Sequence, residues 1–391
     1  MSTGFDPMDT EVRELPVKGE LPQELDGTLL RIGPDHADGQ PLIAALRIRQ
    51  GHAEWFRTRR IRTDPVCRIT GDLPSPGPRR CPSDNTDAAL IQHAGRTLAL
   101  GDGVLPYELA PDLTTKARYD FDGTLPAGFT ARPVHDPVTG ELFAAVLDGE
   151  PPRLWYLVVD VRGRIRKREP VTSWQGHHLP ALALTQRHVL CPEPTRIGVM
   201  PREGTERDLV WITVGEGGID RVVNAFDRPD KRITLDVVRR CRTGPVLWRW
   251  TLDPGAATAS GRLLVRDACT SPVIDPRYHG SEHRYCVMLK ADNSPVRDDV
   301  LVRFDLATGS RQTSPTRLGR LLTAPVTVPR SPTAPEGTGW LLAFAQDTID
   351  DSNTMVVLDT SDFGAEAVAL VDLPSVPHRA LHAAWTVTSA W

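Results

Sequence analysis

A short turn motif recurs along the chain, and each copy separates two runs of residues that favour strands. Asp136-Pro-Val-Thr-Gly140 is one copy, and Asp305-Leu-Ala-Thr-Gly309 is another. The aspartate accepts hydrogen bonds from the backbone that follows it, and the glycine adopts the positive φ that a tight turn requires. A turn of this kind between two β-rich runs predicts a β-hairpin, so the chain is predicted to consist of repeated hairpins.

Short strand-like runs dominate the sequence, and helical periodicity is scarce. The runs lie at 29–32, 44–48, 97–100, 154–161, 188–191, 209–214, 233–239, 247–252, 284–289, 300–306, 340–346 and 355–359. Strands at such even spacing are typical of an all-β sandwich, barrel or propeller. Seven blades would each take about 56 residues, close to known propeller repeats. Because no linker divides the chain, we predict one all-β domain over residues 1–391.

Composition and charge exclude several classes of partner. The net charge of -4 gives no basic surface for nucleic acid. No apolar run reaches the roughly 18 residues of a membrane span, so we expect no stable membrane insertion. The six cysteines form no Cys-x-x-Cys pair, and residues 1–19 do not resemble a signal peptide. These features predict a cytoplasmic protein with reduced thiols and no zinc site.

Several segments, in order along the chain, resemble the carotenoid cleavage oxygenase family. They are 19–34, which ends in Arg31-Ile-Gly-Pro34, and then 51–63, 93–100, 105–109, 129–142, 184–190, 224–225, 271–277 and 381–385. The resemblance covers nearly the whole chain. It implies a seven-bladed β-propeller with an apolar tunnel that leads to the propeller axis.

The resemblance also implies an iron site, and this sequence departs from it. In the family four histidines hold one Fe(II), and three glutamates orient them. The first three histidine positions are here Arg132, Pro180 and Arg221, and only the fourth is kept, as His382. The glutamate positions hold Thr270, Ala324 and Asp102.

One imidazole cannot hold Fe(II), which needs three or more ligands. Arginine does not deprotonate to become a ligand, and ligating histidines rely on neighbouring carboxylates for their orientation. The sequence therefore predicts a site without metal and without a cofactor.

We predict that Arg132, Arg221 and His382 form the catalytic set at the former iron position. The arginines would stabilise an enolate or polarise a carbonyl, and His382 would act as a general acid or base. The side chains predicted to bind substrate are Trp174, His178, Asn224 and Trp385. The expected substrate is a small apolar polyene or polyketide-type molecule with a carbonyl or acidic head. The expected reaction is a cyclisation, cycloaddition, isomerisation or elimination without O₂, in natural product biosynthesis.

Other interpretations stay open at this stage. A register shift could rebuild an iron site from His135, His177, His178 or His378, which would make the protein an Fe(II)-dependent alkene-cleaving dioxygenase. A second alternative is a non-catalytic protein that binds a polyene or lipid. Arg132 and Arg221 could also point away from the site, into salt bridges with Asp136, Asp220 or Asp227.

Overall fold

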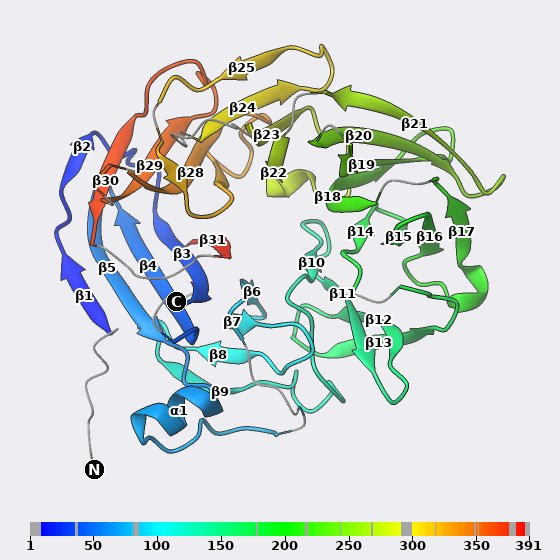
Figure 1. Ribbon diagram of the computed structural model, residues 1–391, viewed down its shortest axis with the longest axis horizontal. Coiled ribbons are helices and arrows are strands. Elements are labelled where there is room, and N and C mark those ends of the chain that lie inside the picture. The colour runs from blue at the N-terminus through cyan, green and yellow to red at the C-terminus, as the bar shows by residue number, and fades with distance from the viewer. Residues whose placement is uncertain are drawn as a thin grey trace. The chain divides into compact units, whose positions relative to one another are not determined.

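The computed structural model describes most of the chain, and its described residues form seven β-sheets in two compact units (Figure 1). The first unit takes in residues 1–131, 293–299 and 314–391, and the second takes in 132–292 and 300–313. The described residues are 9–35, 38–79, 81, 86–176, 179–215, 218–242, 244–266, 269–290, 299–316, 318–347, 349–350, 352–374 and 381–387. The predicted substrate residue His178 and the alternative ligands His177 and His378 lie outside them.

The first unit contains three antiparallel sheets. Sheet A has the order β1-β5-β4-β3-β31, formed by Thr10–Arg13, His52–Arg60, Pro41–Arg49, Gly27–Pro34 and His382–Val387. Sheet B has the order β2-β30-β29-β28-β26, formed by Val17–Gly19, Ala369–Leu373, Asn353–Asp359, Gly339–Gln346 and Arg320–Leu321, and β27 (Val326–Pro329) also pairs with β28. Sheet C runs β6 to β9 in order, formed by Ala89–His93, Arg96–Leu100, Tyr107–Leu109 and Thr115–Arg118.

The second unit contains four sheets, and in each of them four consecutive strands pair in chain order. Sheet D is β10 to β13, formed by Val134–His135, Leu142–Asp148, Arg153–Val159 and Ile165–Val171. Sheet E is β14 to β17, formed by Ala183–Leu184, His188–Pro192, Arg196–Pro201 and Val210–Thr213. Sheet F is β18 to β21, formed by Ile219–Asp227, Ile233–Cys241, Gly244–Asp253 and Thr258–Val265. Sheet G is β22 to β25, formed by Cys269–Val273, Tyr285–Lys290, Val300–Asp305 and Arg311–Thr313.

Helices are few in the described part of the chain. The α-helix α1 spans Asp64–Thr70, and two 3₁₀ helices span Glu206–Asp208 and Pro276–Tyr278. Helix α1 begins where the Thr63 hydroxyl accepts a hydrogen bond from the backbone of Val66, and it ends at Gly71, whose φ is 74°. Both are the usual capping arrangements. The scarcity of helix predicted from the sequence is therefore observed.

The recurrent turn has the structure that its residues predict. Gly140 has a φ of 72°, and its N–H donates to the Asp136 carbonyl oxygen over 2.8 Å. The Asp136 carboxylate accepts from the Val138 N–H and from the Thr139 hydroxyl, over 3.1 and 2.7 Å. Gly309 repeats this geometry with a φ of 74° and a 2.8 Å bond to the Asp305 carbonyl oxygen. Each predicted turn thus closes a hairpin.

The cores lie between neighbouring sheets, because successive strand residues point to opposite faces. On β3, Leu29 packs into a cluster with Phe344 of sheet B, whereas Leu30 packs into a cluster with Leu90 of sheet C. The second unit has equivalent clusters between sheets D and E, between E and F, and between F and G. Both faces of the inner strands are therefore buried.

One buried ion pair links sheets D and E in the second unit. The Asp136 carboxylate accepts from the Arg202 guanidinium over 2.5 Å, and the two side chains are 3% and 11% exposed. Burial raises the pKa of Asp136, but the hydrogen bonds from Thr139 and Arg202 outweigh that effect and hold the pKa below its usual value. Arg202 also donates to the Thr185 carbonyl oxygen over 2.7 Å.

We expect Asp136→Ala to lower the free energy of unfolding by about 3–5 kcal/mol at pH 7, because it leaves Arg202 buried without its partner. Asp148→Ala is the matched control on sheet D: the Asp148–Arg168 pair is more exposed, at 29% and 33%, and its loss should cost at most about 1 kcal/mol. Urea unfolding measures both. A carboxylate with a lowered pKa stabilises the protein above about pH 4 and loses that effect below it, so the Asp136→Ala deficit should shrink in acid. An equal loss of unfolding free energy in Asp136→Ala and Asp148→Ala would contradict the assignment of Asp136–Arg202 as a stabilising buried ion pair.

Candidate active site

His382 begins strand β31 in the first unit and is half-buried. The strand is held in register by β3, with His382 opposite Ile32, and the Leu381 N–H donates to the Ile32 carbonyl oxygen over 2.8 Å. The imidazole Nδ1 accepts the backbone N–H of Leu90 on β6 over 3.3 Å. A nitrogen that accepts from an N–H carries no proton, so the proton of the neutral ring is on Nε2.

This tautomer decides what His382 can do. A histidine that binds a metal donates one ring N–H to a carbonyl or carboxylate and gives the metal the lone pair of the other nitrogen. Here a backbone donor faces Nδ1 instead, so Nε2 holds a hydrogen and acts as a donor. His382 is therefore arranged to give a proton or a hydrogen bond through Nε2.

Arg221 lies near the start of β18 in the second unit, and its side chain is exposed. It forms no ion pair or hydrogen bond with the described residues. Two carboxylates on its own strand that could have bound it have other partners. Asp220 pairs with Arg240 over 2.7 Å, and Asp227 pairs with His188 over 3.0 Å.

Arg132 lies in the loop before β10, and its side chain is exposed. Asp136, the carboxylate suggested as its partner, is bound to Arg202 instead. The residues that precede Arg132 are fixed within the first unit, because the Asp102 carboxylate accepts the Ala131 N–H over 2.7 Å and the Thr130 hydroxyl over 3.1 Å. Asp102, at the position of a family glutamate, thus supports backbone rather than an imidazole.

Asn224 is buried, and its side-chain amide holds a turn of the second unit. Its Nδ2 donates to the carbonyl oxygens of Tyr278 and Ser281 over 3.0 and 2.8 Å and lies 3.1 Å from His283 Nδ1. Its Oδ1 accepts the Gly280 N–H over 3.0 Å. These contacts account for its burial, so they support a structural role. Its predicted contact with substrate stays a prediction.

The two predicted tunnel tryptophans are half-buried and belong to different units. Trp385 lies on β31 in the first unit, packs against the core between sheets A and B, and covers Gly27, where a Cβ atom would meet its ring at 2.4 Å. Trp174 follows β13 in the second unit and packs beside the core between sheets D and E. Hydrogen bonds from the backbone of Ser173 to Glu206 and of Gln175 to Glu193 fix the segment that carries Trp174.

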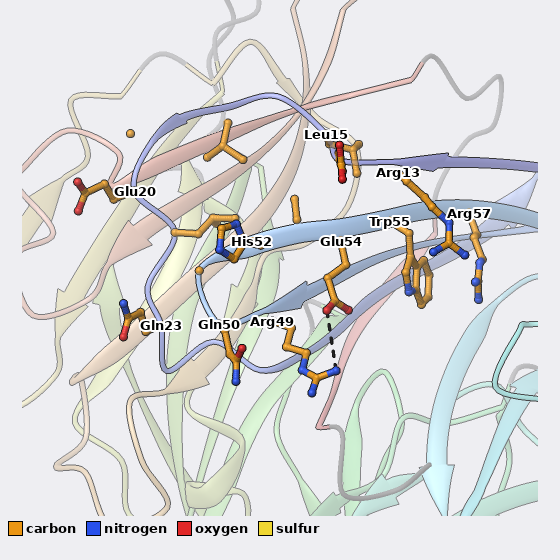
Figure 2. Close-up of a pocket in the computed structure, with 16 residues that line it drawn as sticks. Arg13, Leu15, Glu20, Gln23, Arg49, Gln50, His52, Glu54, Trp55 and Arg57 are labelled. Carbon is orange, nitrogen blue, oxygen red and sulfur yellow. Dashed lines mark ion pairs between the residues drawn. The ribbon is translucent and has the colours of Figure 1, made fainter.

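A polar groove of about 1130 Å³ opens on the first unit, between residues 13–23 and the β4–β5 hairpin (Figure 2). Arg49 and Glu54, which both line it, form an ion pair over 3.9 Å. Figure 2 marks this pair with a dashed line. None of the predicted site residues lines this groove, and its charges are balanced. We therefore assign it no role in the candidate site.

The donor groups do not fit the iron site that the family resemblance implies. Two of the four ligand positions hold guanidiniums, the third holds Pro180, and the fourth holds one imidazole whose Nδ1 faces the Leu90 N–H and not a carboxylate or carbonyl oxygen. Within the described ranges, no group of three or more His, Cys, Asp or Glu side chains could hold a metal ion. His135, an alternative ligand, ends the two-residue strand β10 with an exposed side chain.

No helix in the described part of the chain is long and apolar enough to cross a membrane.

Comparison with known proteins gives one consistent family. The family model for retinal pigment epithelial membrane protein matches residues 5–195 and 191–387. The carotenoid cleavage oxygenase of Mycobacterium tuberculosis is 26% identical over 484 aligned residues, which cover 98% of this chain and 96% of that protein. The isoeugenol monooxygenase of Pseudomonas putida is 28% identical and covers 97% of this chain, with 95% of its own length aligned.

Solved structures agree with this result. The lignostilbene dioxygenase of Pseudomonas brassicacearum superposes with a TM-score of 0.84 at 24% identity, and the match covers 98% of this chain and 96% of that one. The fold class predicted from the sequence, a seven-bladed β-propeller, is therefore confirmed. The chain belongs to the family of retinal pigment epithelial membrane protein and the carotenoid cleavage oxygenases.

Proposed function

We propose that this protein is an enzyme for a small apolar molecule with conjugated double bonds, and that it acts without a resident iron ion. The family supports the first part, because relatives are named for carotenoid, isoeugenol and resveratrol, each of which has a conjugated carbon–carbon double bond in a largely hydrocarbon skeleton. The hydrogen bond from the Leu90 N–H to His382 Nδ1 supports the second part, since it leaves Nε2 as a donor at the one ligand position that still holds a histidine.

The proposed roles follow from the chemistry of each side chain. His382 gives a proton through Nε2, a contribution that typically accelerates a reaction 10²- to 10⁴-fold. Arg221 has no partner among the described residues, so its charge is available to an anionic or carbonyl oxygen of the substrate. We propose the same role for Arg132. A cyclisation, cycloaddition, isomerisation or elimination needs only such proton transfer and charge stabilisation.

A second candidate is an Fe(II)-dependent dioxygenase that cleaves an alkene. The names of the relatives favour it, since they are carotenoid, stilbene and isoeugenol oxygenases. It requires ligands other than Arg132, Pro180 and Arg221. Metal content and oxygen use separate the two candidates.

We expect the purified protein to contain well below one iron ion per chain after expression in iron-rich medium and anaerobic incubation with Fe(II). The reason is that the four ligand positions offer two guanidiniums, a proline and one imidazole, whereas Fe(II) needs three or more ligands. Elemental analysis gives the content, and the triple variant Arg132→His, Pro180→His, Arg221→His serves as a control for iron uptake. Stoichiometric iron in the natural chain, together with O₂-dependent cleavage of isoeugenol, would establish the dioxygenase instead.

We expect Arg221→Ala to lower kcat/KM at least about 100-fold, which is the usual effect of removing one donor that stabilises developing charge. Its thermal stability should stay near that of the natural chain, because the side chain is exposed and has no partner to lose among the residues that the structure describes. The control is Arg240→Ala on the same hairpin, which removes an exposed arginine paired with Asp220. Turnover of a conjugated polyene aldehyde under nitrogen, followed by mass spectrometry, measures the effect. Equal activity of the two variants would remove Arg221 from the site.

A further inference from the structure

Arg31 is a fully buried arginine that has no hydrogen-bond partner among the described residues. It lies on strand β3 of sheet A, and its side chain is 0% exposed. Its Nε, Nη1 and Nη2 atoms all lack a partner in the part of the chain that the structure describes. Other well-buried arginines of the protein are paired: Arg47 contacts Asp26 over 2.5 Å, and Arg249 contacts Asp236 over 2.7 Å.

An unpaired buried charge is strongly unfavourable, because water is removed and nothing replaces it. Burial lowers the pKa of Arg31 to about 9, so the guanidinium is still charged at neutral pH. The ring of Phe344 on β28 lies below it, 4.8 Å from the guanidinium carbon. A cation–π contact of this kind stabilises a desolvated cation only in part and satisfies none of its five N–H groups.

The residues around Arg31 are small and apolar. Its cross-strand neighbours are Ala44 on β4 and Ala383 on β31, and the next residue on the same face of β3 is Gly33. The surrounding core between sheets A and B includes Leu29, Leu42 and Phe344. The guanidinium is therefore a polar group in an apolar environment, and the residues paired with Arg31 on the two neighbouring strands are both alanines.

A second buried polar atom without a partner in the described ranges, the Thr323 hydroxyl oxygen, lies on the segment beside β28, the strand that carries Phe344. The Thr323 hydroxyl oxygen is buried and makes no hydrogen bond with any residue in the described ranges. It follows Leu322, whose N–H donates to the Phe344 carbonyl oxygen over 2.8 Å. Two polar groups without a partner among the described residues are thus associated with β28. The Arg31 guanidinium contacts the ring of Phe344, and the Thr323 hydroxyl lies on the segment that pairs with β28.

We propose that Arg31 is the anion-binding point of a buried site in the first unit, and that its ligand is an apolar molecule with a carboxylate. The carboxylate accepts two parallel hydrogen bonds from the guanidinium, the geometry in which arginine binds carboxylates best. The apolar body of the ligand lies against Phe344 and the core between sheets A and B. The inference builds on the proposed function, because it takes the apolar substrate of that proposal and gives it an acidic head.

The test measures binding and not turnover, so it can fail or succeed independently of the proposed reaction. The probes are trans-stilbene-4-carboxylate and the matched alcohol, trans-stilbene-4-methanol, titrated into the full-length protein by calorimetry. We expect the acid to bind about ten- to a hundredfold more tightly than the alcohol, the difference that a charged hydrogen bond gives. Sodium chloride alone, followed by thermal unfolding, tests whether an inorganic anion fills the site.

Arg31→Met removes the charge and keeps the length of the side chain. It should abolish the preference for the acid without loss of thermal stability, because removing an unpaired buried charge does not destabilise a core. Arg47→Met on the neighbouring strand should instead lose stability and keep the preference, since Arg47 is already paired.

Three results would overturn the proposal. One is equal binding of acid and alcohol by the natural chain, which decides the matter even if Arg31→Met does not fold. Another is an acid preference that survives in Arg31→Met. An Arg31-dependent stabilisation by chloride without any by the carboxylate would also overturn it, in favour of an inorganic anion.

Discussion

Sheet A depends on hydrogen bonds between strands from the two ends of the chain. Strand β3 near the N-terminus pairs with β31 near the C-terminus, from Gly27 opposite Val387 to Ile32 opposite His382. Sheet B is completed in the same way, because β2 pairs with β30. These pairings close the first unit, and they also fix the register of the strand that carries His382. The orientation of the imidazole toward the Leu90 N–H thus follows from the pairing that holds the first unit together.

Most buried charges of the described chain are paired, and Arg31 is the exception that separates structure from candidate function. In the second unit Asp136 pairs with Arg202, and Asp236 pairs with Arg249 beside the buried ring of His283. Burial lowers the pKa of His283 to about 4, so this ring stays neutral beside the pair. Such networks satisfy their own charges and need nothing from outside. Arg31 is not satisfied in this way, although it lies in an equally apolar core.

Much of the fold could be predicted because its signals are local. Asp136, Gly140 and Gly309 lie in turns whose geometry depends on a few neighbouring residues, and the runs between such turns are strands. The candidate site could be predicted only as a set of aligned positions. The contact of His382 joins residues 292 positions apart, and no local pattern reveals it. Arg132 precedes the two-residue strand β10, and Arg221 lies at a bulge in β18. At such positions the alternation of residues along a strand does not give the direction of a side chain. The signal that sequence reasoning missed was Arg31, a charge within the apolar run Leu29-Leu30-Arg31-Ile32.

The contacts that hold the described fold together are hairpin turns, strand pairs and apolar clusters between sheets. His382 takes part in them through its backbone, opposite Ile32, and Arg221 through its backbone, opposite Val238. Where a metal is part of the folding free energy, its ligands cannot change without loss of structure. At the positions that the resemblance assigns to iron ligands, Arg132 and Arg221 have exposed side chains, and Pro180 lies in the loop before β14. We therefore expect other side chains at these positions to leave the architecture intact, as when function resides in a site and not in the fold.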